Sequence, residues 1–129
     1  MPEKIRIFLV EDDQDLQEMY ETKFTMEGFE VVKAENGAAA LNKITGDKPD
    51  IILLDIVMPE IDGFQVLKDI KANPDTKEIP VILLTNLGQD GDIKKGMELG
   101  AVDYLIKANF TPNEVVEKVK KALGNTEEK

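Results

Sequence analysis

Four largely aliphatic runs recur along the chain, and a polar residue stands at the end of each. Runs of this kind are typical of strands buried on both faces, which occur in parallel sheets covered by helices. The ligand crevice of such a sheet lies at the carboxyl ends of its strands. If the four strands are neighbours, the polar residues that follow them therefore meet at one rim. The runs are residues 5–10, 51–54, 81–84 and 102–106, and they lead into Glu11, Asp55, Thr85 and Lys107.

Helical patterns fill the segments between these runs. Apolar residues at helical spacing predict five helices, and glycine or proline marks their ends. A shorter run at 30–34 alternates between apolar and polar residues, which predicts a fifth strand at an edge of the sheet. Thr111 is a typical N-cap, because Pro112 and Glu114 follow it in the first helical turn. The predicted helices are 16–27 before Gly28, 38–44 ending near Gly46, 64–73, a helix with Ile93, Met97 and Gly100 after a mobile loop at 88–92, and 111–123.

Strict alternation of strands and helices predicts the α/β class. With right-handed crossovers, the helices cover both faces of a doubly wound five-stranded parallel sheet. The prediction is a flavodoxin-like three-layer sandwich with strand order 2-1-3-4-5. This order places the first and third strands side by side at the topological switch point, so Glu11 and Asp12 are expected next to Asp55.

The composition narrows the range of possible chemistry. The 129 residues fit one domain, expected over 1–129 with a core at 4–123 and a polar tail at 125–129. A net charge of −10 disfavours a nucleic-acid or anionic-membrane surface. The sequence contains no Cys, His, Ser or Trp, which excludes disulfides, Cys or His metal sites, and Ser, Cys or His catalysis. With no signal peptide and no membrane-length apolar run, we expect a cytoplasmic protein.

Three carboxylates at the predicted rim favour a bound cation. Like charges about 5 Å apart repel by roughly 3 kcal/mol at an effective dielectric near 20. Glu11, Asp12 and Asp55 offer oxygen ligands only, which suit a hard ion, so Mg²⁺ with several retained waters is the expected cofactor. Asp55 ends a rigid apolar strand and can act as a nucleophile toward phosphorus, and Lys107 and Thr85 are expected to contact the phosphoryl oxygens. Taken singly, each of these residues also fits an ordinary strand end.

The motifs that carry these residues resemble one known family. From about Lys4 to Leu123 the chain is similar to the response-regulator receiver domain of two-component signalling, and to its chemotaxis-regulator-like single-domain members. The order and spacing of the motifs fit the family without gaps. The motifs are Phe8–Asp13, Leu54–Pro59 followed by Asp62–Gly63, Leu83–Thr85, and Gly100–Lys107.

The resemblance implies a Mg²⁺-dependent phospho-acceptor. Asp55 corresponds to the phosphorylated residue, which takes its phosphoryl group from a phosphohistidine on a sensor histidine kinase or a histidine phosphotransfer protein. Asp12 corresponds to the direct Mg²⁺ ligand, Glu11 to the second member of the acidic pair, and the backbone carbonyl of Val57 to a third metal contact. Asp13 ranks below this pair, because Asp12 keeps the family's distance to Asp55.

The resemblance also implies a conformational switch. Lys107 corresponds to the family's phosphate-contacting lysine and Thr85 to its switch hydroxyl. Tyr104 corresponds to the aromatic residue that turns inward when Thr85 moves; the plain alternative is a strand residue with its hydroxyl at the edge. The coupled movement alters a face for partner binding, and glycines are expected to ease it. This face draws on 91–99, 102–106 and 111–123, with glycines Gly88, Gly91 and Gly96 in or beside it.

One departure from the family pattern concerns the residue after the lysine. The family often has a proline there, joined by a cis peptide, whereas this chain has Ala108. The Lys107–Ala108 peptide is therefore open between cis and trans at this stage. A cis bond before a residue other than proline costs about 2.5–4 kcal/mol, which favours a trans peptide and a differently shaped loop.

The expected output is protein binding. Only polar residues follow Gly124, so we expect a single-domain regulator that acts on an unknown downstream protein, as a monomer or, when phosphorylated, as a dimer. It is not expected to be an enzyme beyond its own phosphorylation and autodephosphorylation. Val57 and Leu87 flank the expected path of water, and their apolar side chains predict a long-lived phosphate.

Three alternatives remain at this stage. A phosphorylation-independent interaction module of the same fold is the main one, although none of the expected functional residues is missing. An aspartyl phosphatase often carries a second aspartate two residues after the nucleophile, where this chain has Val57. A flavin-binding protein needs a loop rich in Ser, Thr and Gly after its first strand, and residues 11–15 would repel the flavin phosphate.

Overall fold

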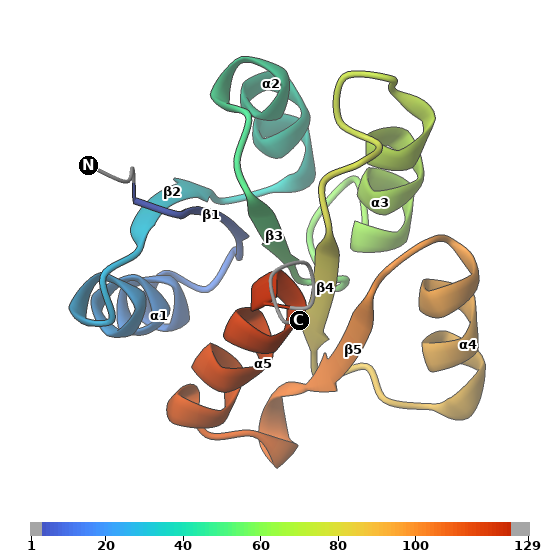
Figure 1. Ribbon diagram of the computed structural model, residues 1–129. Helices are drawn as coiled ribbons and strands as arrows, with labels where there is room; N and C mark the ends of the chain where they lie inside the picture. The colour runs from blue at the N-terminus through green and yellow to red at the C-terminus, as the bar shows by residue number, and fades with distance from the viewer. Residues whose placement is uncertain (1–3, 125–129) are drawn as a thin grey trace.

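The computed structural model describes residues 4–124, in which five parallel strands form one sheet between two layers of helices (Figure 1). The strand order is β2-β1-β3-β4-β5, as predicted from the alternation of strands and helices. The strands are β1 (Arg6–Val10), β2 (Glu30–Ala34), β3 (Ile51–Leu54), β4 (Val81–Thr85) and β5 (Asp103–Ile106). The helices are α1 (Gln14–Met26), α2 (Gly37–Asp47), α3 (Gly63–Ala72), α4 (Asp90–Glu98) and α5 (Pro112–Gly124), with a 3₁₀ turn η1 (Lys107–Asn109) after β5.

Each face of the sheet has its own hydrophobic core. Side chains alternate along a strand, so Ile7 and Leu9 of β1 point to one face while Phe8 and Val10 point to the other. Helices α1 and α5 cover the first face, and α2 and α3 pack on the second, with α4 beside β5 (Figure 1). The three-layer sandwich predicted from sequence is therefore confirmed. Strand β2 lies at an edge, as its alternating pattern predicted.

Side-chain caps fix where the helices begin. The Asp13 carboxylate caps α1 by accepting hydrogen bonds from two backbone N–H groups of its first turn, and the Asp62 carboxylate caps α3 by accepting one, from the Gln65 N–H. At the start of α5, the Thr111 hydroxyl accepts from the Glu114 N–H at 3.1 Å while the Glu114 carboxylate accepts from the Thr111 N–H at 2.8 Å. This reciprocal pair is a capping box. Gly28 ends α1 with a φ of +96°, which a residue with a side chain rarely adopts.

The prediction for α4 was wrong at both ends. The stretch 88–92 was expected to be a mobile loop, but the helix already begins at Asp90 and it ends at Glu98, so Gly100 lies outside it. Asp90 and Asp92 occupy its first turn, where carboxylates interact favourably with the helix dipole. Gly100 instead has a φ of +110° in the turn before β5.

Two further predictions concern membrane-spanning helices and the polar tail. No helix within residues 4–124 is long and apolar enough to cross a membrane. The predicted polar tail at 125–129 lies outside the described residues.

Candidate functional site

The carboxyl ends of four adjacent strands meet at one rim of the sheet. The pairing Val10↔Leu54 brings the end of β1 beside β3, and Thr85↔Ile106 brings β4 beside β5. The residues that follow or end these strands surround a hollow of about 580 Å³. The rim residues predicted from sequence therefore do come together. The hollow is lined by Glu11, Asp12, Asp13, Leu16, Asp55, Val57, Thr85, Asn86, Leu87 and Lys107.

Lys107 forms the electrostatic centre of this rim. Its ammonium group lies 2.7 Å from Glu11 Oε1 and 2.9 Å from Asp55 Oδ2. The two carboxylate residues are nearly inaccessible, with Glu11 2% and Asp55 6% exposed. Burial by itself lowers the pKa of Lys107, but its hydrogen bonds to Glu11 and Asp55 outweigh burial, so this pKa lies above the ordinary value. Burial raises the pKa of Glu11, and Lys107 offsets only part of that effect.

The carboxylates outnumber the cation that balances them. One oxygen from each of Glu11, Asp12 and Asp55 lies within 4.8 Å of the other two. Lys107 bonds to Glu11 and Asp55, so the three negative charges of the cluster face one ammonium group, and these four side chains carry a net charge of about −2. An all-oxygen donor set with this excess charge fits a hard divalent cation such as Mg²⁺.

Asp13 and Val57 lie next to the acidic cluster and make different contacts with it. The Asp13 carboxylate is engaged in capping α1, while its backbone N–H donates to Glu11 Oε2 at 3.1 Å. That engagement agrees with ranking Asp13 below the acidic pair. The Val57 N–H donates to Asp55 Oδ1 at 3.3 Å, which turns the loop after β3 toward the carboxylate. The assignment of the Val57 carbonyl as a metal ligand stays a prediction.

Leu87 connects the two residues predicted to form the switch. Thr85 is fully buried, and its hydroxyl oxygen accepts a hydrogen bond from the Leu87 N–H at 3.3 Å. The Tyr104 hydroxyl donates to the carbonyl of the same Leu87. Burial raises the pKa of Tyr104 to about 12, and the negative charges of Asp92 and Asp55 act in the same direction. The two backbone groups of Leu87 therefore link Thr85 to Tyr104.

The glycines near this switch allow close packing. A Cβ atom on Gly96 would lie 2.6 Å from Leu83 Cδ1 and 3.0 Å from the Tyr104 ring. A Cβ atom on Gly88 would lie 2.7 Å from the Ile106 side chain. Gly96 is the only buried residue among the nine of α4. Helix α4 thus approaches β5 and the Tyr104 ring at a position where only glycine fits.

The loop after Lys107 has a trans backbone. No cis peptide bond occurs within residues 4–124, so the Lys107–Ala108 bond is trans. This is the isomer favoured by the energetic cost of a cis bond before a residue other than proline. Residues 107–109 form the 3₁₀ turn η1, and Lys107 still reaches both Glu11 and Asp55. The Ala108 N–H donates to Asn86 Oδ1 at 3.2 Å.

Sequence reasoning missed two polar side chains near the rim, Asn86 and Gln17. Gln17 of α1 donates through its amide to the carbonyls of Glu11 and Ala34, at 3.0 and 3.3 Å. It therefore ties the end of β1 to the end of β2. The available signal for Asn86 was its place directly after Thr85. Gln17 had only a weak signal, a polar position on the half-buried side of α1.

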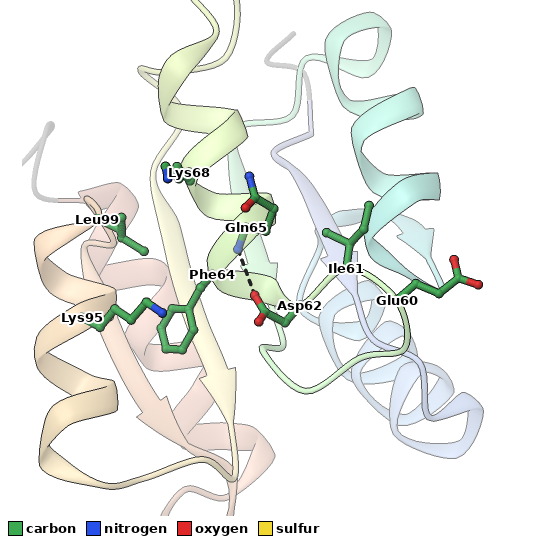
Figure 2. Close-up of a pocket in the computed structure, with 8 residues that line it drawn as sticks. All are labelled: Glu60, Ile61, Asp62, Phe64, Gln65, Lys68, Lys95 and Leu99. Atoms are coloured by element: carbon green, nitrogen blue, oxygen red, sulfur yellow. Dashed lines mark hydrogen bonds between the residues drawn. The ribbon is translucent and has the colours of Figure 1, made fainter.

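A second hollow, of about 380 Å³, lies between α3 and α4, apart from the acidic rim (Figure 2). The Lys95 ammonium of α4 sits 4.5 Å from the centre of the Phe64 ring of α3, at cation–π distance. Lys68 and Lys95 share this hollow with Glu60 and Asp62, so its charge favours neither an anion nor a cation. The Lys95–Phe64 contact attaches α4 to α3.

Comparisons with known proteins agree on one family. The family model described as the response regulator receiver domain matches residues 7–120. The chain is 38% identical to the phosphate regulon transcriptional regulatory protein PhoB of Escherichia coli over 118 residues, which are 92% of this chain and 51% of that protein. It is 37% identical over 123 residues to the transcriptional regulator ycf27 of Guillardia theta, covering 95% of this chain and 47% of the relative. The chain thus spans about half the length of these relatives.

A solved structure agrees with the sequence relatives. A Chloroflexus aurantiacus protein described as a response regulator superposes with a TM-score of 0.88 at 36% identity, and the match covers 95% of this chain and 99% of that one. The similarity therefore extends from the motifs at the rim to the whole described fold.

Proposed function

The chain belongs to the response regulator receiver family of two-component signalling, and from this premise we propose that it is a phospho-acceptor switch in which Asp55 is phosphorylated. The donor would be a phosphohistidine on a sensor histidine kinase or a histidine phosphotransfer protein. The observation that carries the proposal is the contact of one ammonium group, on Lys107, with both Asp55 and Glu11 at the carboxyl ends of the strands.

The rim residues have distinct parts in the proposed transfer. An oxygen of Asp55 forms a bond to phosphorus while the phosphorus–nitrogen bond of the donor breaks and its electron pair returns to the imidazole. The Val57 N–H, at 3.3 Å from Asp55 Oδ1, holds the carboxylate in one orientation. Lys107 already contacts Asp55 and would follow the new negative charge onto the phosphoryl oxygens.

The acidic pair supports this transfer by holding a metal. Glu11, Asp12 and Asp55, with the Val57 carbonyl, would hold Mg²⁺, which when bound supplies positive charge opposite Lys107. A metal there also offsets the excess negative charge of the three carboxylates, so the same ion favours both the resting site and the approach of a phosphoryl group.

Phosphorylation would alter the partner-binding face through a shift of Leu87. A phosphoryl group on Asp55 gives the Thr85 hydroxyl a new acceptor, which competes with the present Leu87 N–H contact. Because Tyr104 bonds to the Leu87 carbonyl, a shift of Leu87 changes the position of Tyr104 and of α4, which packs on its ring. Moving such an equilibrium from 1% to 99% active needs roughly 5.5 kcal/mol of preferential stabilisation. The output would be binding of a downstream protein at the α4–β5–α5 face.

The buried cluster of Glu11, Asp55 and Lys107 favours the switch over an interaction module that does not use phosphorylation. A silent module has no need to keep two buried carboxylates against one lysine, because such a cluster is costly unless it is used. We infer further that the chain is not an enzyme with a separate substrate and promotes only its own phosphorylation and dephosphorylation.

The test of this function is the intact mass of the protein after incubation with acetyl phosphate, with and without Mg²⁺. We expect a Mg²⁺-dependent gain of one phosphoryl group by the wild type and none by Asp55→Asn, since the amide is not a nucleophile toward phosphorus. The Asp13→Asn variant is a matched control, because Asp13 caps α1 and its carboxylate is not in the acidic cluster.

Beryllofluoride with Mg²⁺ distinguishes a protein whose phosphorylated form is short-lived from a protein that is not phosphorylated. Perturbation of the Thr85 and Tyr104 resonances by this mimic would support the switch even if the mass gain decays too fast to record. If neither acetyl phosphate nor beryllofluoride affects the wild type, the chain is a constitutive binding module.

The apolar wall of the hollow is expected to set the lifetime of the phosphate. Val57 and Leu87 line the hollow together with Asp55. Replacing Leu87 with Asn or Glu would hold water near the phosphoryl group, so we expect hydrolysis to accelerate roughly three- to tenfold, which corresponds to about 1 kcal/mol. The measurement is the first-order decay of the phosphorylated mass after removal of the donor. Leu99→Asn is the control, because Leu99 lines the other hollow; an unchanged lifetime in both Leu87 variants would refute the shielding.

A further inference from the structure

Asn86 and Ala108 form a contact just beyond the last paired residues of β4 and β5. The ladder between these strands ends at the pair Thr85↔Ile106. Beyond this pair, the Asn86 side-chain carbonyl accepts a hydrogen bond from the Ala108 N–H at 3.2 Å. A side chain thus takes the part of a backbone acceptor and extends the connection between the two strands toward the acidic rim.

This contact lies next to the residue that crosses the rim. Lys107 starts from the end of β5, at one edge of the sheet, and its ammonium contacts carboxylates at the ends of β1 and β3, on the far side of β4. A lysine side chain has four flexible bonds, so a stable backbone at its base reduces the number of positions open to the ammonium group. The Asn86 bond is made to the peptide that directly follows Lys107.

The residue types at both positions are those that the contact requires. Ala108 has a backbone N–H, which proline would lack. Asn86 is short, and its amide oxygen can accept a hydrogen bond from a neighbouring backbone. The turn also has a contact of its own, from the Phe110 N–H to the Lys107 carbonyl at 3.3 Å, which stays within residues 107–110. The Asn86 bond therefore adds a link between the turn and β4 beyond the Thr85↔Ile106 pair.

We propose that Asn86 is a positioning residue that holds the backbone at Ala108 and thereby aims Lys107 at Asp55. Its consequence for phosphoryl transfer rests on the proposed function, whereas its consequence for the backbone and for Lys107 does not. Asn86 also lines the hollow, so the rival role is direct contact between its amide and the phosphoryl group. Only the positioning role acts through Lys107.

The first part of the experiment needs no phosphorylation. Amide hydrogen exchange of Ala108 is measured by NMR in the wild type, Asn86→Ala and Asn86→Asp. We expect exchange about three- to tenfold faster in Asn86→Ala, since the donor loses its acceptor, and near-wild-type exchange in Asn86→Asp, which keeps an acceptor oxygen. At a fixed neutral pH, the Lys107 side-chain resonances should move toward those of the solvent-exposed Lys94 in Asn86→Ala.

The second part separates positioning from direct contact. The rate of phosphoryl uptake from acetyl phosphate is compared for Asn86→Ala in the wild-type and Lys107→Met backgrounds. We expect a loss of about fivefold in the wild-type background and no further loss when Lys107 is absent, because residues that act as a unit are not additive. Circular dichroism checks that each variant is folded, and the exchange data on Asn86→Ala stand even if Lys107→Met is not.

Three results would overturn the positioning role. Unchanged amide exchange of Ala108 in Asn86→Ala would show that the Asn86–Ala108 hydrogen bond is not formed in solution. Unchanged Lys107 resonances would show that the contact does not aim the lysine. A loss of uptake that persists in the Lys107→Met background would assign Asn86 to direct contact with the phosphoryl group. If the wild type takes up no phosphoryl group, the proposed function fails, and the exchange and resonance data still decide the positioning.

Discussion

Replacing Gly63 with alanine is expected to lower the free energy of unfolding by about 3 kcal/mol or more, at the upper end of the cost of overpacking. A Cβ atom at this position would lie 2.2 Å from the Asp55 carbonyl oxygen and 2.6 Å from Ile56 Cα. Both neighbours are backbone atoms, so no side-chain rotation relieves the overlap. The first turn of α3 would have to move away from the end of β3, which carries Asp55, and the Gly63 N–H would lose its 2.8 Å bond to the Ile56 carbonyl.

The measurement is urea unfolding of the wild type and two alanine variants. Gly46→Ala is the matched control, since Gly46 lies in α2 and no atom would come within 4 Å of its new Cβ. Alanine favours helix over glycine by about 0.5–1 kcal/mol, so this control should be slightly more stable than the wild type. Equal stability of Gly63→Ala and the wild type would mean that the β3–α3 connection is not packed as described.

The sequence allowed the fold to be predicted wherever the hydrophobic pattern was unambiguous. The aliphatic runs of β3 and β4 are fully buried, and their uninterrupted pattern identified central parallel strands. The alternating pattern of β2 placed it at an edge. The start of α4 was mispredicted because glycine and aspartate are also turn residues, so the stretch at 88–92 resembled a loop, although the same aspartates favour a first helical turn.

The candidate site was predictable to the extent that it depends on strand ends. Asp55 and Lys107 meet because parallel strands end at one rim, which follows from the strand order. Asn86 acts through one side-chain bond to a backbone group 22 residues away, and Gln17 acts through two, to backbone groups 6 and 17 residues away. Such contacts follow no periodicity and depend on the final loop geometry, so no local pattern identifies them.

The role of Gly96 needed three-dimensional information as well. From the sequence, Gly96 was interpreted as a source of flexibility, whereas the structure shows close packing of α4 against Leu83 and Tyr104 at this position. A glycine in a helix fits either interpretation until its neighbours are known. The packing implies that α4 and the Tyr104 ring move together, because the helix lies directly on the ring.

Replacing Lys107 with methionine is expected to have the largest effect on the site. The Lys107 side chain is 11% exposed, and its ammonium group bonds to two carboxylates whose side chains are less exposed still. Removing one partner from a buried ion pair leaves uncompensated charge and typically costs about 3–5 kcal/mol. Because this rim opens on a hollow that water can enter, we expect a loss near the low end, about 3 kcal/mol, in the absence of divalent cations.

Added Mg²⁺ should reverse part of that loss, and this reversal tests the balance of charge at the rim. A cation that binds only the folded protein stabilises it by about 2.7 kcal/mol at a hundred times its Kd. The three carboxylates of the Lys107→Met variant lack an internal cation, so its unfolding free energy should rise more with Mg²⁺ than that of the wild type. Asp12→Asn should behave in the opposite way, with higher stability than the wild type in EDTA and a smaller gain from Mg²⁺, since Asp12 belongs to the acidic cluster but does not contact Lys107. Urea unfolding of the three proteins in EDTA and in Mg²⁺ measures both effects, and equal Mg²⁺ gains in all three would show that the acidic cluster does not bind the ion.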